Sequence, residues 1–216
     1  MPFTTLLVDL DDTVYPSGNG LWETIARRID LFMIERLGIP GPEVPAIRQD
    51  LFRRYGTTLR GLDATRHIDR RDYLSFVHDI PLQDYLKPDG RVRSALQACP
   101  LRRFIFTNSD RAHAGRVLKA LELDDLFDQV IDIEDIWPYC KPMPEAFRLA
   151  LERCGAQPHE CIFIDDTLAN LASARNLGLS TILVRPSPPP AGEIAIPNLA
   201  DLNAALAHLS AGPASS

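Results

Sequence analysis

Short apolar runs rich in β-branched and aromatic residues alternate with longer segments of helical periodicity along most of this 216-residue chain. These runs predict five buried strands, at residues 5–8, 103–107, 130–132, 161–164 and 181–184. From the second strand onward, a helical segment separates each strand from the next. Because parallel neighbours need crossover connections, which are usually helices, this alternation predicts an α/β fold built on one parallel sheet.

The alternation is interrupted between the first and second strands. This stretch contains helical segments but no run of the strand type, with helices predicted at 21–37, 44–55 and 69–77. Residues 57–61 are predicted to form a loop. We therefore expect a helical cap at 16–88, inserted after the first strand, and a core formed by 1–15 together with 89–210.

Three carboxylates, those of Asp9, Asp11 and Asp12, follow the first strand within four residues. In a parallel sheet, the carboxyl ends of the strands are where ligands bind. Like charges this close repel one another, and Mg²⁺, which prefers carboxylate and carbonyl oxygens, would compensate them. The alternative is a solvated acidic turn in which Asp12 or Thr13 caps a helix.

Polar residues also follow the other predicted strands. Thr107 and Asn108 end the second strand, Lys141 follows the region of the third, and the fourth breaks into Asp165 and Asp166. Taken singly, each is typical of a solvated loop, a strand end or a helix cap. Together they would meet at one edge of the sheet, and this concentration indicates an active site.

The residue types suit phosphoryl transfer. A carboxylate can attack phosphorus if the negative charge of the phosphate is neutralised. Mg²⁺ held by Asp9 and the acids of the fourth strand would supply part of that neutralisation, and Lys141 would supply more. The Thr107 hydroxyl and the N–H groups of the following helix start would hold the remaining oxygens. Asp11 would protonate the leaving oxygen and then activate water.

At this point the sequence resembles the haloacid dehalogenase (HAD) superfamily of aspartate-nucleophile phosphatases. The resemblance rests on four motifs in order, namely Asp9-Leu10-Asp11-Asp12-Thr13, Thr107-Asn108, Lys141-Pro142 and Asp165-Asp166 with Asn170. It implies a Rossmann-like, HAD-like core with a C1-type helical cap, Asp9 as nucleophile and Asp11 as acid/base. It also implies Mg²⁺ bound by the Asp9 side chain, the Asp11 carbonyl and Asp166, with Asp165 either bound to the ion or just behind its ligands.

A narrower resemblance, to the pyrimidine 5′-nucleotidase branch of fungi, plants and bacteria, rests on residues 55–62, 72–78 and 106–114. It implies hydrolysis of nucleoside monophosphates such as UMP and CMP. Substrate choice would come mostly from the cap, where candidate contacts are Tyr55, Thr57, Thr58 and Arg60. The alternative for this segment is an ordinary helix stop followed by a helix cap.

Other polar residues carry no predicted role. The five histidines, His67, His78, His113, His159 and His208, show no metal-ligand spacing and are interpreted as surface or packing residues. The four cysteines show no Cys-x-x-Cys spacing and are typical of reduced, buried thiols. A proline-rich surface loop at 186–190 and a disordered tail at 211–216 are expected.

Composition excludes several classes of protein. The net charge of −6 argues against nucleic acid polymers as partners, because these bind a basic face. No apolar run approaches the roughly 20 residues that span a bilayer, and the chain enters its first strand without a leader. We therefore expect a cytoplasmic protein that acts on a small phosphomonoester without binding a membrane. The oligomeric state is left open.

The predicted function is a Mg²⁺-dependent phosphomonoester hydrolase acting through an aspartyl-phosphate, and more narrowly a pyrimidine 5′-nucleotidase. A phosphatase or phosphomutase for another metabolite, such as a sugar phosphate or phosphoglycolate, is the first alternative. A metal-free haloacid dehalogenase is disfavoured, because a halide leaving group needs neither the Asp11 proton nor the Asp165-Asp166 pair. A non-enzymatic regulator is disfavoured by the complete set of reactive groups.

Overall fold

The computed structural model describes residues 3–185 and 191–211 of the chain. The chain divides into two compact units. The first, called the core unit here, comprises Met1–Ser17 and Leu86–Ser216, and the second, called the cap unit, comprises Gly18–Tyr85. The proline-rich segment at 186–190 and all but the first residue of the predicted tail at 211–216 lie outside the described residues.

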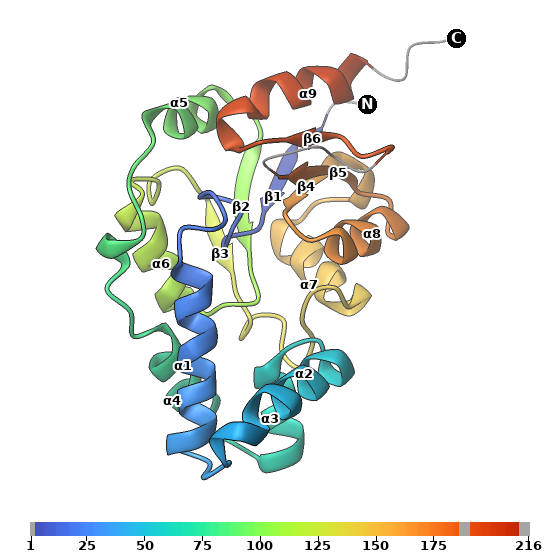
Figure 1. Ribbon diagram of the computed structural model, residues 1–216. Coiled ribbons are helices and arrows are strands. Elements are labelled where there is room, and N and C mark those ends of the chain that lie inside the picture. The colour runs from blue at the N-terminus through green and yellow to red at the C-terminus, as the bar shows by residue number, and fades with distance from the viewer. Residues whose placement is uncertain (1–2, 186–190, 212–216) are drawn as a thin grey trace. The chain divides into compact units, whose positions relative to one another are not determined.

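The core unit is built on a parallel six-stranded sheet in the order β3-β2-β1-β4-β5-β6 (Figure 1). Its strands are β1 (Thr5–Val8), β2 (Arg102–Phe106), β3 (Gln129–Ile131), β4 (Cys161–Asp165), β5 (Ser180–Val184) and β6 (Ala195–Ile196). The prediction of an α/β fold with one parallel sheet is confirmed. The two-residue strand β6 was not predicted, because two residues are too few to show a strand pattern.

Register at the centre of the sheet aligns the ends of three strands. Val8, the last residue of β1, is paired with Ile105 of β2 on one side and with Ile164 of β4 on the other. The residue after Val8 is therefore level with the last residues of both neighbouring strands. This alignment brings the polar residues that follow β1, β2 and β4 to one edge of the sheet.

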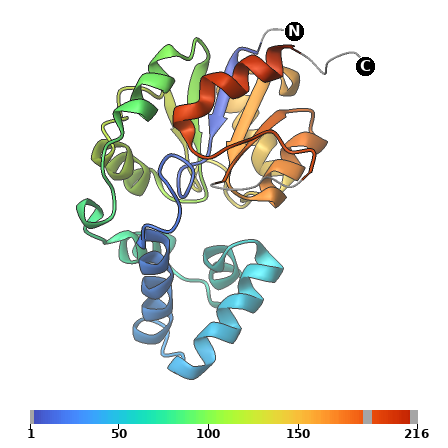
Figure 2. The same ribbon diagram turned by 45° about the horizontal axis from the view of Figure 1, so that its top comes forward.

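Helices cover both faces of the sheet (Figures 1 and 2). They are α5 (Gly90–Ala98), α6 (Arg111–Ala120), α7 (Pro144–Cys154), α8 (Leu168–Asn176) and α9 (Leu202–Ala211). Because both faces are covered, strand β1 is fully buried along its length. The rings of Phe106, Phe147 and Phe163 pack against one another at centroid distances of 5.2 to 5.9 Å, just below the polar edge. The polar edge of the sheet therefore adjoins a cluster of packed aromatic rings in the core.

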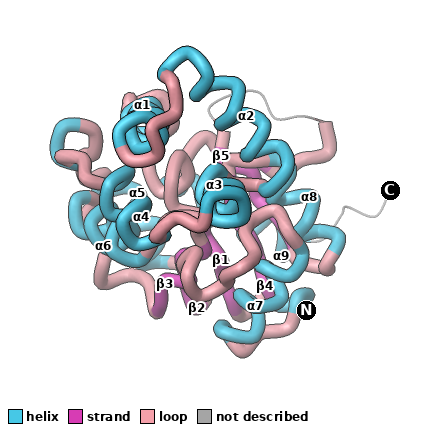
Figure 3. The backbone as a smooth tube through the Cα atoms, turned by 90° about the horizontal axis from the view of Figure 1, so that it is seen from below, coloured by secondary structure: helices cyan, strands magenta, loops and turns pink. Residues whose placement is uncertain are grey.

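The cap unit contains helices and no strand, and Figure 3 draws α1 to α4 in the cyan used for helices. Its helices are α1 (Leu21–Glu35), α2 (Val44–Tyr55), α3 (Thr58–Arg66) and α4 (Arg70–His78). Its interior includes an edge-to-face contact between Phe32 of α1 and Tyr73 of α4, with ring centroids 5.0 Å apart. Among the described residues, no helix is long and apolar enough to cross a membrane.

The loop predicted at residues 57–61 is wrong, because these residues begin helix α3. Gly56 ends α2 with a φ of 84°, and the Thr57 side chain then accepts a hydrogen bond from the Arg60 N–H at 3.1 Å, which caps the new helix. Gly61 is a packing glycine, since a Cβ there would lie 2.7 Å from the Cβ of Leu51. The glycine thus allows α2 and α3 to approach closely.

Candidate active site

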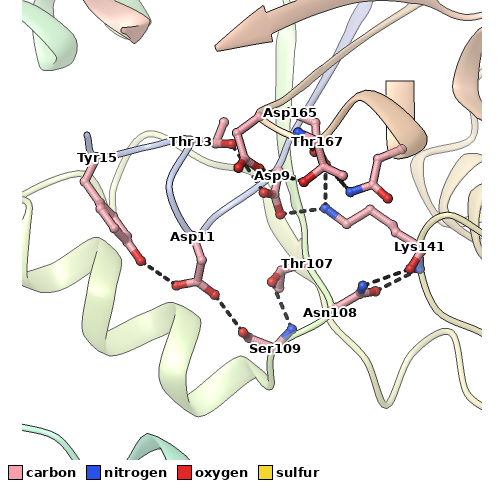
Figure 4. Close-up of polar contacts among 12 residues, drawn as sticks. Asp9, Asp11, Thr13, Tyr15, Thr107, Asn108, Ser109, Lys141, Asp165 and Thr167 are labelled. Carbon is pink, nitrogen blue, oxygen red and sulfur yellow. Dashed lines mark hydrogen bonds and ion pairs between the residues drawn. The ribbon is translucent and has the colours of Figure 1, made fainter. Parts of the chain in front are cut away.

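Asp9 directly follows strand β1 and lies at the polar edge of the sheet (Figure 4). Its N–H donates to the Ile164 carbonyl at 2.9 Å, which continues the pairing of β1 with β4 by one residue. In the same way, the Thr107 N–H donates to the Ile131 carbonyl at 3.0 Å, which continues the pairing of β2 with β3 by one residue. Asp9 and Thr107 are both buried, at 8% and 1% exposure. Backbone pairing alone therefore determines where these two side chains begin.

A tight turn follows Asp9. Asp12 adopts a left-handed conformation with a φ of 59°, and the Val14 N–H donates to the Leu10 carbonyl at 3.0 Å. The turn returns the Thr13 hydroxyl to Asp9, where it donates to Oδ2 at 3.3 Å. This geometry differs from the solvated helix cap that was the alternative for Asp12 and Thr13, because the turn folds back onto the first carboxylate.

Lys141 joins two of the carboxylates. Its Nζ donates to Asp9 Oδ1 at 2.5 Å and to Asp165 Oδ2 at 2.9 Å, and the residue is 3% exposed. Burial disfavours the charged ammonium, but the charges of Asp165 and Asp9 outweigh it, so the pKa of Lys141 lies above its ordinary value. The Nζ also lies 5.3 Å and 5.4 Å from the ring centroids of Phe106 and Phe163. Lys141 is thus a permanent buried cation.

The carboxylates repel one another in spite of this cation. Burial, together with the charges of Asp165 and Asp166, raises the pKa of Asp9 well above its ordinary value, although Lys141 acts in the opposite direction. Burial and the charge of Asp165 raise the pKa of Asp166 to about 6. Asp9, Asp165 and Asp166 each offer an oxygen, and these oxygens lie within 4.8 Å of one another. Such a group of hard donors fits a divalent cation.

Asp165 differs from the other two acids in how fully it is bonded. It accepts hydrogen bonds from the Thr167 N–H at 2.8 Å and from the Asn170 amide at 3.0 Å, in addition to the one from Lys141. Asp166 is less enclosed and accepts a bond from the Thr167 hydroxyl at 3.2 Å. Asp166 therefore has more bonding capacity for a further ligand than Asp165.

Asn108 lies next to Lys141 but bonds to its backbone. The Asn108 amide nitrogen donates to the Lys141 carbonyl at 3.1 Å, and the Lys141 N–H donates to the Asn108 amide oxygen at 2.8 Å. The two bonds form a clamp that holds the Lys141 loop against the end of β2 (Figure 4). These contacts make Asn108 a residue that positions the lysine.

Asp11 points toward helix α6 and away from Asp9 (Figure 4). Its Oδ1 accepts a bond from the Tyr15 hydroxyl at 2.8 Å and lies 3.0 Å from His113 Nε2, and its Oδ2 accepts a bond from the Ser109 hydroxyl at 2.7 Å. Burial and the charge of Asp11 raise the pKa of Tyr15 above its ordinary value, so the phenol keeps its proton. Residues of two segments thus converge on one carboxylate.

Sequence reasoning missed Tyr15, Ser109 and His113. His113 was interpreted as a surface or packing residue, but it is fully buried and contacts Asp11. The sequence feature that could have identified His113 is its place in the first turn of a helix. Asp110 caps α6 by accepting a hydrogen bond from the His113 N–H at 2.9 Å. The first turn of a helix that follows a strand faces the edge of the sheet, so a side chain there can reach the site. Of the remaining histidines, His78 is buried and the others are exposed.

Of the four cap residues predicted to contact substrate, three make hydrogen bonds within the cap unit and the fourth is buried there. Thr57 caps α3, and the Arg60 guanidinium donates to the Tyr55 carbonyl. Thr58, at 7% exposure, is buried among the cap helices. These contacts agree with the helix-cap interpretation of this segment, and a role in substrate binding stays a prediction.

Comparison with known proteins identifies the family. The model of the haloacid dehalogenase-like hydrolases matches residues 3–178, which is most of the chain. The chain therefore belongs to the haloacid dehalogenase-like hydrolase family, as the four motifs predicted. A solved structure of the HAD-hydrolase YfnB from Bacillus subtilis, bound to magnesium, shows the same fold, with a TM-score of 0.60 and 20% identity over 95% of this chain and 99% of that chain.

Two curated relatives extend the comparison. Phosphate metabolism protein 8 of Saccharomyces cerevisiae is 30% identical over 191 residues, which cover 81% of this chain and 59% of the yeast protein. Fructose-1-phosphate phosphatase YqaB of Escherichia coli is 31% identical over 113 residues, which cover 52% of this chain and 55% of that protein. The matches thus span less than two thirds of the length of either relative.

Proposed function

We propose that this chain is a phosphatase that cleaves small phosphomonoesters with Asp9 as its nucleophile. The observation that carries the proposal is the buried Lys141 ammonium, 2.5 Å from Asp9 and 2.9 Å from Asp165. A carboxylate attacks a phosphate only where nearby positive charge offsets the repulsion between the two anions. Lys141 supplies a permanent part of that charge beside Asp9, and membership of a hydrolase family supports the same chemistry.

The proposed reaction has two steps. An Asp9 oxygen bonds to phosphorus as the bond from phosphorus to the alcohol oxygen breaks, and Asp11 gives that oxygen a proton. Water then attacks the phosphorus of the aspartyl-phosphate and passes a proton to Asp11, while the bond to Asp9 breaks and inorganic phosphate leaves. The Thr107 hydroxyl and the Lys141 ammonium hold the phosphate oxygens throughout.

Mg²⁺ fits the acidic end of this proposed site, because Asp9, Asp165 and Asp166 gather hard oxygen donors within 4.8 Å. We expect the Asp9 and Asp166 side chains and the Asp11 carbonyl to hold the ion, since Asp165 already accepts several hydrogen bonds from its surroundings. When bound, the ion would offset negative charge on the phosphate and the carboxylates. The magnesium in the YfnB structure supports this expectation.

The proposed substrates are pyrimidine nucleoside 5′-monophosphates such as UMP and CMP. The proposal rests on the resemblance of residues 55–62, 72–78 and 106–114 to the pyrimidine 5′-nucleotidase branch. The first two of these segments lie in the helical cap unit, outside the four catalytic motifs. Because the core groups bind only phosphate, discrimination between bases has to come from such segments.

A second candidate is a phosphatase for sugar phosphates. The similarity to the Escherichia coli fructose-1-phosphate phosphatase favours it, because that match covers about half of this chain. The two candidates share the reaction at phosphorus and differ only in the alcohol that leaves. They are therefore separated by substrate preference and by nothing in the chemistry of Asp9.

The test is a phosphate-release screen over UMP, CMP, AMP, GMP, fructose 1-phosphate and phosphoglycolate at equal concentration, with Mg²⁺ and then with EDTA. We expect the highest kcat/KM on UMP and CMP and loss of turnover in EDTA. A higher kcat/KM on fructose 1-phosphate would replace the first candidate with the second. Conversion of a sugar phosphate to its isomer without phosphate release would indicate a phosphomutase.

Two further outcomes would overturn the phosphatase proposal itself. Metal-independent halide release from a 2-haloacid, without phosphate release from any ester, would indicate a dehalogenase. Failure to release phosphate or halide from any compound, by a protein that folds normally, would favour a non-enzymatic role. Phosphate release by the wild type is therefore the first requirement of the proposal, before any variant is tested.

A further inference from the structure

The Asp11 carboxylate is bonded by side chains from two separate segments. Tyr15 comes from the loop after β1, whereas Ser109 and His113 come from the start of α6, nearly a hundred residues later in the chain. The contacts are 2.8, 2.7 and 3.0 Å long, and they use both carboxylate oxygens. All three side chains are 9% exposed or less, so water competes little for these bonds.

We propose that Tyr15, Ser109 and His113 are positioning residues that set the direction of the Asp11 carboxylate for proton transfer. The inference rests on the proposed phosphatase function, in which Asp11 is the acid/base. None of the three residues belongs to the four motifs that identified the family. They act through Asp11 and take no part in attack on phosphorus.

The start of α6 is held firmly enough to serve as a fixed reference. Asp110 accepts a bond from the His113 N–H at 2.9 Å, and Asp132 accepts one from the Arg111 N–H at 2.8 Å. The Ser109 N–H donates to the Thr107 hydroxyl at 3.0 Å, which ties the helix start to the end of β2. Ser109 and His113, the two partners of Asp11 in this segment, are therefore held in place by contacts that do not involve Asp11.

The geometry also explains why a buried histidine occupies this helix. A fully buried imidazole is costly unless it is hydrogen-bonded, and an apolar side chain would pack in α6 at lower cost. His113 instead places Nε2 against Asp11, on the side of the carboxylate shared with Tyr15. Two side chains on Oδ1 and one on Oδ2 oppose rotation of the carboxylate, which a single bond would not do.

A positioning role makes a specific kinetic prediction. A misdirected Asp11 would slow the step in which the leaving oxygen takes a proton, but would hardly affect a leaving group that needs none. His113→Leu, Tyr15→Phe and Ser109→Ala should each lower kcat about ten-fold on an alkyl phosphate, and at most about three-fold on p-nitrophenyl phosphate. Across a series of aryl phosphates, the dependence of rate on leaving-group pKa should become steeper.

A matched variant separates positioning from damage to the helix. Val117→Ala removes two methyl groups from a fully buried side chain one turn along α6 and deletes none of the groups that contact Asp11, so it should lower both rates equally or not at all. Tyr15→Phe removes a single oxygen and serves as the test if His113→Leu does not fold. His113→Gln, which keeps an amide donor near the position of Nε2, should recover part of the lost rate on the alkyl phosphate.

A double variant identifies the residue through which the effect passes. In an Asp11→Asn background, His113→Leu should cause no further loss on the alkyl phosphate. Equal loss on both esters, or additive loss in the double variant, would overturn the positioning role while the phosphatase function stood. The proposed function would instead be overturned if the wild type released no phosphate, or if Asp9→Asn released it as fast as the wild type. The two failures are therefore distinguishable.

Discussion

Asp9 and Asp11 are two residues apart in the loop after β1, yet their surroundings differ in kind. Asp9 faces charges, namely the Lys141 ammonium and the carboxylates of Asp165 and Asp166. Asp11 faces the hydroxyls of Tyr15 and Ser109 and the imidazole of His113. Coulombic interaction depends mainly on distance, whereas a hydrogen bond also depends on direction. The groups around Asp9 therefore determine the local electrostatic charge, and the groups around Asp11 determine the orientation of its carboxylate.

The difference suits the two proposed roles. A nucleophile that attacks an anion needs positive charge close by, and a proton donor needs its oxygen aimed at the leaving group. If this comparison is right, changes around Asp9 should affect all phosphate esters alike, and changes around Asp11 should depend on the leaving group. Substitutions around the two carboxylates therefore test this division.

The largest effect should come from Asp9→Asn. The amide cannot form the covalent bond to phosphorus, so we expect kcat to fall about 10⁴-fold or more on every ester, with the fold retained. Phosphate release and thermal unfolding measure the two parts of this prediction. Asp124→Asn, which removes an exposed carboxylate of the core unit, is the matched control and should leave both unchanged. Near-normal rates in Asp9→Asn would exclude covalent catalysis by Asp9.

Asp11→Asn should give a smaller and selective effect. General acid–base catalysis contributes about 10²–10⁴-fold, so we expect kcat on an alkyl phosphate to fall at least about 100-fold. On p-nitrophenyl phosphate the expected loss is less than about five-fold, because that leaving group departs without protonation. Paired kinetic measurements on the two esters check this ratio. An equal loss on both would remove the distinction between the two carboxylates.

Asn108→Ala should cause a moderate loss of activity that, like the loss expected for changes around Asp9, does not depend on the leaving group. Without the clamp on the Lys141 peptide, the ammonium would shift relative to Asp9, and kcat/KM should fall about ten-fold on good and poor leaving groups alike. The matched control is Asn203→Ala, which removes the hydrogen bond that the Asn203 side-chain amide donates to the Ala95 carbonyl elsewhere in the core unit. A loss confined to poor leaving groups would contradict the role given to Asn108.

The sequence predicted the fold well because strand runs and helical periodicity are local signals. The five longer strands and the polar ends of β1, β2 and β4 are all visible in one pass along the chain. Parallel pairing then requires those ends to meet, and the structure brings Asp9, Thr107 and Asp165 together with Lys141. The mutual placement of these groups was therefore predictable without coordinates.

What the sequence did not show depends on contacts between distant segments. The network around Asp11 joins residues that lie nearly a hundred positions apart, and neither a histidine nor a tyrosine signals such a contact by its type. Gly61 was interpreted as a loop residue because the local pattern cannot distinguish a turn glycine from one that lets two helices approach. The hydrogen bonds between Asn108 and the Lys141 backbone also join distant segments and could not be predicted from the local sequence.

The smallest expected effect concerns stability, and it tests the charged side of the comparison alone. The pKa of Asp166, raised to about 6, exceeds its ordinary value of 3.8, so the folded protein binds this proton more tightly than the unfolded chain does. The contribution to stability is therefore present below about pH 4 and is lost as the pH rises through 6. Without metal, the ionised Asp166 should thus destabilise the folded state at neutral pH.

Asp166→Asn should remove that destabilisation. Full conversion of the pKa difference gives about 3 kcal/mol, and partial exposure of Asp166 reduces the expected gain in free energy of unfolding to about 1 kcal/mol at pH 7.5. Urea unfolding in EDTA should show this gain at pH 7.5 and none at pH 4, with Asp124→Asn as the control. Mg²⁺ should then stabilise the wild type more than the variant, because the variant lacks one proposed ligand. Equal stability of the two proteins at both pH values, with equal response to Mg²⁺, would mean that the charge at Asp166 is not part of the cluster around Asp9.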